Sequence, residues 1–97
     1  MRSDVLERTK SFQTIPGIGP SMAHDLIDLG FSNASELRGA DPERMYSDLC
    51  ELRGQQMDRC VLYVFRCAVY FVGNDSHDPN LLKWWNWKDE FHHTDGR

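Results

Sequence analysis

The amino-acid sequence predicts an all-α protein that folds as one domain. Signals that begin a helix and glycines that end one alternate five times along the 97 residues, whereas the alternating apolar and polar pattern of strands is absent. A chain of this length buries enough apolar surface to fold without a metal or a disulfide. We therefore expect a single domain over residues 1–97, with frayed ends near 1–3 and 91–97, where the sequence is polar and aperiodic.

The first two predicted helices flank a turn that is rich in proline and glycine. The first runs from about Asp4 to Gln13 and stops before Pro16. The second covers residues 21–29, where apolar residues recur at positions i, i+4 and i+7, and Gly30 ends it.

The middle of the chain predicts a short helix followed by a longer one. A single helical turn around Leu37 is expected to end at Gly39. Asp41 and Pro42, a capping residue and a first-turn proline, then begin a helix that Gly54 terminates. Its apolar residues at helical spacing are predicted to face the core: Met45, Leu49 and Leu52.

The C-terminal half predicts a central helix and a last helix that covers it. Residues 57–72 are apolar around most of a helical circumference, so this helix should be buried. After a polar loop, residues 81–87 are expected to form a last helix that lies back over the body of the protein.

The turn between the first two helices, IPGIGP at residues 15–20, carries the strongest functional signal. Gly17 and Gly19 permit backbone angles that other residues avoid, and the next helix begins with N–H groups that point outward and can hold a phosphate. The turn resembles the helix-hairpin-helix motif, in which a Gly-hydrophobic-Gly loop presents backbone N–H groups to the phosphates of one DNA strand. This resemblance implies a compact five- to six-helix helix-hairpin-helix (SAM-like) domain. The predicted DNA-phosphate contacts are Gly17, Ile18, Gly19, Ser21 and Lys10.

The charge of the chain predicts that such DNA binding is weak and strongly salt-dependent. The formal net charge is −4, whereas Lys and Arg supply most of the affinity for nucleic acid. Helix-hairpin-helix members usually carry Lys or Arg where this chain has Ser21, and Lys10 and Arg8 restore part of that charge. The contact carries no base information. The alternative is a tight turn that only packs Ile15 and Ile18 into the core.

A polar line on the predicted central helix is a second candidate surface. Four residues at i, i+4, i+7 and i+11 lie within about 60° of one another on a helix: Arg59, Tyr63, Arg66 and Tyr70. Because arginine pairs with phosphate and aromatic rings stack on bases, this line predicts a secondary anion or base contact. The alternative is a partly buried polar seam whose arginines pair with acids such as Asp41, Asp48 or Asp58.

The three cysteines, Cys50, Cys60 and Cys67, are expected to be buried free thiols. Their odd number suits a reducing compartment, and no CxxC pair is present. Cys60 and Cys67 would lie about 10 Å apart along a helix, too far to share one zinc ion. We expect no metal and no cofactor. We also expect no catalytic residue, because no motif supports a nucleophilic cysteine and a cysteine in an apolar helix has a raised pKa. A second candidate metal site near the C-terminus is as weak as the cysteines: Asp89, His92 and His93.

Three tryptophans, Trp84, Trp85 and Trp87, bury a large area when packed and form an adhesive patch when they are not. We expect two of them to pack and one to contact a partner or a second copy. The longest apolar run, residues 60–72, is interrupted by Arg66 and too short to span a bilayer. The protein is therefore expected to be cytoplasmic, with no membrane partner.

Three further segments, taken with IPGIGP and the spacing between them, resemble one known family: DPERMYSDLC from Asp41, DRCVLYVFRCAVYF from Asp58 and LLKWWNWKD from Leu81. From about Phe12 to Asp89 the chain resembles the bacterial pathogenicity locus proteins, also labelled mitomycin resistance proteins. This resemblance implies a DNA-associated helix-hairpin-helix protein, an accessory in DNA repair or uptake, without enzymatic activity. The competing expectation is a protein-interaction or homodimerisation module that does not bind DNA.

Overall fold

The structure, a computed structural model, describes the backbone of residues 2–88 and the side chains of residues 7–88. Over this range it contains four α-helices and three 3₁₀ turns, with no strand, which confirms the all-α prediction. Of the ends predicted to fray, Arg2 and Ser3 belong to the first helix, and residues 91–97 lie outside the described range. None of the described helices is long and apolar enough to cross a membrane.

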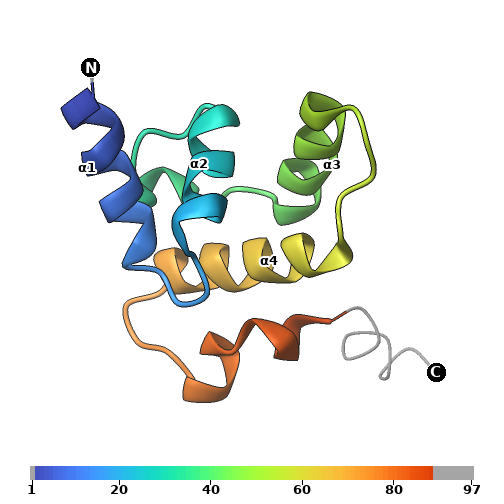
Figure 1. The fold of residues 1–97 in the computed structure, drawn as a ribbon. Coiled ribbons are helices and arrows are strands. Elements are labelled where there is room, and N and C mark those ends of the chain that lie inside the picture. Colours follow the sequence, from blue (N-terminus) through green and yellow to red (C-terminus); the bar gives the residue numbers. More distant parts are fainter. Residues whose placement is uncertain (1, 89–97) are drawn as a thin grey trace.

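Helices α1 (Arg2–Gln13) and α2 (Pro20–Asp28) pack side by side and are joined by a tight turn (Figure 1). Gly30 ends α2, as predicted, because it adopts a φ of +103° that returns the chain toward the helix. The Phe31 N–H then donates to the carbonyl of Leu26 at 3.1 Å.

The 3₁₀ turn η1 (Ala34–Leu37) and helix α3 (Pro42–Arg53) follow the predicted signals closely. The carboxylate of Asp41 caps α3 by accepting from the Glu43 N–H at 3.0 Å. Gly54 ends α3 in the left-handed conformation, with a φ of +70°. The predicted boundaries of α3 are therefore confirmed.

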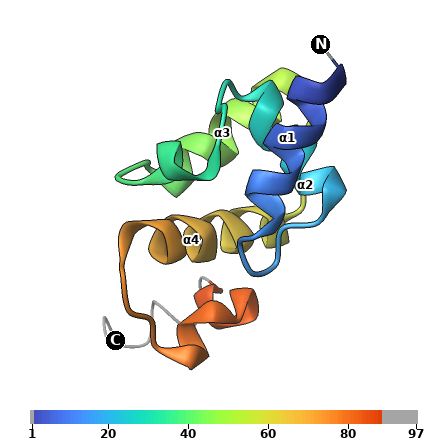
Figure 2. The same ribbon diagram turned by 90° about the vertical axis from the view of Figure 1, so that its left-hand side faces the viewer.

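Helix α4 (Arg59–Gly73) is the central helix, as predicted. It runs beneath α2 and α3 in Figure 1. The C-terminal segment, residues 79–87, lies along its opposite side in both ribbon views (Figures 1 and 2). Its packing partners include α3, η1 and the C-terminal turns. The buried residues of α4 form the middle of the core: Leu62, Val64, Phe65, Cys67 and Ala68.

The prediction of a last α-helix over residues 81–87 is wrong. The chain forms two 3₁₀ turns, η2 (Pro79–Leu82) and η3 (Trp84–Trp87), with Lys83 extended between them. The Leu81 carbonyl, which a continuous helix would pair with a backbone N–H four residues later, accepts from the indole Nε1 of Trp87 at 2.8 Å. Packing of the tryptophans on α4 thus outweighs the local preference for a helix.

The core also corrects one predicted side-chain position. Leu52 is 51% exposed, although its spacing from Met45 and Leu49 predicts burial. It lies in the last turn of α3, beyond Leu49, the last buried residue of that helix. Elsewhere the core joins the hairpin, α3 and α4 through large apolar side chains: Phe12, Ile15, Leu26, Leu37, Leu49, Leu62 and Phe65.

Candidate nucleic-acid interface

The turn between α1 and α2 is anchored by its two isoleucines. The side chains of Ile15 and Ile18 are buried in the core, and the Ile18 N–H donates to the Ile15 carbonyl at 3.1 Å. Between them, Gly17 is exposed and has a φ of +86°, which side-chain-bearing residues rarely adopt. The turn therefore packs the core and also leaves backbone at the surface.

The start of α2 presents backbone donors that have no partner within the helix. Gly19 is the N-cap and offers no side-chain hydrogen bond, and Pro20 occupies the first helical position. The first intrahelical bond runs from the Ala23 N–H to the Gly19 carbonyl at 2.9 Å, so the N–H groups of Ser21 and Met22 precede it. The first turn of α2 contains no acidic residue, so none of its own side chains compensates the positive end of the helix dipole.

The residues predicted to contact phosphate differ in where they lie and in whether the backbone N–H group is already hydrogen-bonded. Gly17, Gly19 and Ser21 lie together at the turn and the start of α2, whereas the N–H of Ile18 is already used by Ile15. Lys10 is exposed in the last turn of α1, the turn that leads into the hairpin. The predicted cation therefore lies on α1 rather than at the start of α2.

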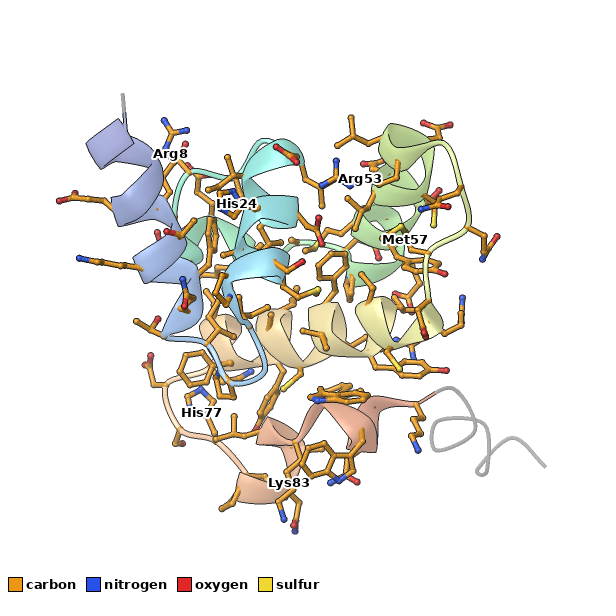
Figure 3. The ribbon with its side chains drawn as sticks, viewed as in Figure 1. Arg8, His24, Arg53, Met57, His77 and Lys83 are labelled. Atoms are coloured by element: carbon orange, nitrogen blue, oxygen red, sulfur yellow. The ribbon has the colours of Figure 1, made fainter. Side chains whose placement is uncertain are left out.

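The acidic residues of α2 are paired with an arginine from α3. Arg53 Nη2 lies 2.7 Å from Asp25 Oδ1 and 2.8 Å from Asp28 Oδ2. Figure 3 shows Arg53 between the two helices. Hydrogen bonds to both carboxylates raise the pKa of Arg53 above its ordinary value. This pairing offsets part of the negative charge that the C-terminal half of α2 would otherwise carry.

The hairpin turn rests on the C-terminal segment. A Cβ atom added at Gly17 would lie 3.3 Å from Cδ1 of Trp84 and 3.8 Å from Cγ1 of Val64. Trp84 itself packs against the hydrophobic core. The sequence gives no local signal for this contact, because Gly17 and Trp84 lie near opposite ends of the chain.

The polar line on α4 is covered by neighbouring elements at Arg66, whereas Arg59 is exposed. The Arg66 guanidinium donates to Glu43 Oε2 from Nε at 3.0 Å and from Nη2 at 2.7 Å. Its Nη1 donates to the Trp87 carbonyl at 2.7 Å, and the Arg66 side chain is 14% exposed. Arg66 thus pairs with an acid, as the polar-seam alternative expects, but the acid is Glu43.

Residues of the polar line on α4 also contact aromatic rings. The guanidinium of Arg59 lies 5.5 Å from the ring centroid of Tyr46, and that of Arg66 lies 5.8 Å from the ring of Tyr63. The ring of Tyr70 lies 5.6 Å from that of Trp87. Near Arg66 and Tyr70, α3, α4 and η3 form an open surface pocket of about 460 Å³ lined by Pro42, Glu43, Arg66, Val69, Tyr70 and Trp87.

The acids named as alternative partners have other roles in the structure. Asp48 pairs with Arg44 at 3.3 Å on the surface of α3. Asp41 caps α3, and Asp58 caps α4 by accepting from the Cys60 N–H at 3.0 Å. The partner of Arg66 was missed because Glu43 is brought to α4 only by the packing of α3.

The three cysteines are free thiols in different environments. Cys67 is buried, and burial raises its pKa to about 11. Cys50 is partly buried, and its Sγ accepts from the Met57 N–H at 3.3 Å. The expectation of burial is wrong for Cys60, which is exposed because it lies in the first turn of α4, ahead of the first buried residue of that helix, Leu62.

No cluster of metal-ligating side chains occurs among the described residues. The tail residues considered for metal binding lie outside the described range: Asp89, His92 and His93.

The three tryptophans differ in how far their side chains are buried. Trp84 and Trp87 are partly buried against α4 and its neighbours, whereas Trp85 is 48% exposed. The rings of Trp84 and Trp85 meet edge to face, with centroids 5.7 Å apart. Trp85 is therefore the indole available for a contact with another molecule.

These features define a class: small all-α proteins in which a Gly-Ile-Gly turn joins the first two helices and a tryptophan segment covers the central one. The chain matches the family model Cdd1, described as pathogenicity locus, over residues 6–93, and it belongs to that family. The match includes both the hairpin and the tryptophan segment. No curated protein and no solved structure matches the chain.

Proposed function

We propose that this chain is a non-catalytic helix-hairpin-helix domain that binds the DNA backbone weakly and without sequence preference. The start of α2 is the observation that carries the proposal. There the N–H groups of Ser21 and Met22 lack helical partners, the N-cap Gly19 has no side chain, and the first turn has no acid. Phosphate oxygens satisfy such donors and favour the positive end of the helix dipole.

Lys10 is the cation that would reinforce this phosphate contact. It is exposed in the last turn of α1, and the pairing of Arg53 with Asp25 and Asp28 reduces repulsion from α2. The net charge of −4 still opposes association, so binding is best seen at low ionic strength. A role as an accessory in DNA repair or uptake is part of this proposal, as is a cytoplasmic location, which the free cysteines support.

The absence of catalysis in this proposal is supported by the state of the thiols. The pKa values of Cys67 and Cys60 are both raised, the first by burial and the second chiefly by desolvation and the carboxylate of Asp58. Nucleophilic cysteines require the opposite shift.

The decisive experiment places a carboxylate at the start of α2. Ser21→Glu should weaken binding of a fluorescently labelled duplex at least tenfold at low salt, because the new carboxylate repels phosphate from the N–H groups. The same carboxylate stabilises a helix N-terminus, so the variant should remain folded. Ser47→Glu, at an exposed position of α3, is the control with an equal change in net charge.

Fluorescence anisotropy measures both variants. Equal binding by Ser21→Glu and Ser47→Glu, or no binding of the unmodified protein at the lowest ionic strength, would overturn the proposal. Ser21→Lys supplies the cation usual in the motif and should tighten binding roughly threefold to tenfold at low salt.

The exposed indole of Trp85 supports a second candidate, a protein-interaction or homodimerisation module. Trp85 is 48% exposed beside partly buried Trp84, and aromatic side chains of this kind anchor interfaces. Light scattering at high protein concentration should then show a dimer that Trp85→Ser dissociates. A monomer in both samples would count against self-association.

A further inference from the structure

The pocket between α3, α4 and η3 is lined by side chains that can bind a flat ring. Pro42 and Val69 supply apolar surface, while the rings of Tyr70 and Trp87 lie 5.6 Å apart at a tilt of 44°. Its volume of about 460 Å³ is within the range of small-ligand sites. Aromatic faces of this kind stack on nucleobases in proteins that bind single strands.

The polar side of the pocket is an ion pair without net charge. Glu43 Oε2 accepts from Nε and Nη2 of Arg66 at 3.0 and 2.7 Å, which fixes the carboxylate in place. Because the guanidinium compensates the carboxylate, the pair attracts neither a phosphate nor a cation strongly. The Glu43 side chain is nevertheless 58% exposed, so its carboxylate can accept a hydrogen bond from a ligand.

We infer that this pocket holds an unpaired nucleobase that carries an exocyclic amino group. The base stacks on the ring of Tyr70 or of Trp87 and contacts the other ring at an angle, and its amino group donates to the carboxylate of Glu43. This inference rests on the proposed function and deepens it, because the hairpin would hold the backbone of a strand whose base enters the pocket. The sequence predicted an anion or base contact at Arg66. The inference assigns a base contact there and adds Glu43 and Trp87 to the predicted contact residues on α4.

Two single-stranded oligonucleotides of equal length test the inference, since their backbone charges are identical. Oligo(dC) carries amino groups and oligo(dT) does not, so fluorescence anisotropy should show at least fivefold tighter binding of oligo(dC). Glu43→Gln should remove most of this preference, because the amide also donates to the carbonyl of thymine. The amide oxygen still accepts from Arg66, which preserves the local fold.

Glu51→Gln is the matched control, because Glu51 is an exposed residue of α3 that does not line the pocket. It changes the net charge equally and should retain the preference for oligo(dC). Equal binding of the two oligonucleotides, or equal behaviour of the two Gln variants, would overturn the inference. Binding of a basic peptide that displaces Arg66, without any base preference, would do so as well.

A second measurement separates this pocket from the hairpin. Free cytidine should shift the indole N–H resonance of Trp87, assigned through Trp87→Phe, and thymidine should shift it at least fivefold less at the same concentration. If cytidine binds but the duplex does not, the proposed backbone contact at the hairpin is wrong and the inference about the pocket stands. If duplex binding depends on Ser21 but cytidine causes no shift, the inference about the pocket is wrong and the proposed backbone contact at the hairpin stands.

Discussion

Gly17 and Gly19 flank the same isoleucine but tolerate a side chain differently. Gly17 has a φ of +86° and faces Trp84, whereas Gly19 has a φ of −97° and open space around the position of a Cβ. Gly17→Ala should therefore reduce the free energy of unfolding by about 1–3 kcal/mol. Gly19→Ala should cost only about 0.5 kcal/mol, as a poorer N-cap. Urea denaturation measures both, and equal losses would show that neither the backbone angle nor Trp84 restricts Gly17.

The thiols should differ in reactivity because their exposure differs. In the folded protein, iodoacetamide should modify exposed Cys60 before Cys50, and buried Cys67 only after unfolding. Modification of Cys60 should be slow at neutral pH and accelerate on the alkaline side, since its pKa is raised. Peptide mass spectrometry follows each site. Rapid labelling of Cys67 would indicate that the C-terminal turns leave α4 readily.

The cap of α4 predicts how stability depends on pH. Asp58 accepts from the Cys60 N–H, and this hydrogen bond lowers the pKa of its carboxyl. A carboxylate with a lowered pKa in the folded state stabilises the protein fully above its unfolded pKa, which is about 4. That stabilisation is lost as the pH falls through the folded value.

Asp58→Asn keeps a capping side chain that does not titrate. The unmodified protein should therefore lose stability relative to Asp58→Asn between pH 5 and 2 or so, the range in which such a carboxylate titrates. Thermal melts followed by circular dichroism at each pH measure the difference. A constant difference over that range would contradict the role of the Asp58 charge.

The helices differ in how well their limits could be predicted. Asp41, Pro42 and Gly54 mark α3 correctly because caps and stops act within one helical turn. The segment after Pro79 was mispredicted because its backbone depends on where the indoles pack, and the Leu81 carbonyl accepts from Trp87. Leu52 and Cys60 were misplaced because helical spacing defines a face but not how far the covering elements extend.

The four helices and the C-terminal turns should unfold together. All three tryptophans lie in η3, which packs on α4 and under Gly17, while circular dichroism reports mainly α1 to α4. Urea unfolding curves from tryptophan fluorescence and from circular dichroism should therefore coincide. A fluorescence transition at lower urea would show that the tryptophan segment detaches first.

The amino-acid sequence sufficed for the helical class and the hairpin turn, because both depend on residues that are close in the chain. It also sufficed for the family, because the four characteristic segments and their spacing are read directly from the sequence. Caps, glycine stops and apolar spacing act over a few residues and survive without tertiary context. Only the tertiary structure placed Trp84 beneath Gly17, paired Arg66 with Glu43 and opened the pocket beside Trp87. Such contacts join segments far apart in sequence, and the geometry of packing on α4 decides them rather than any local preference.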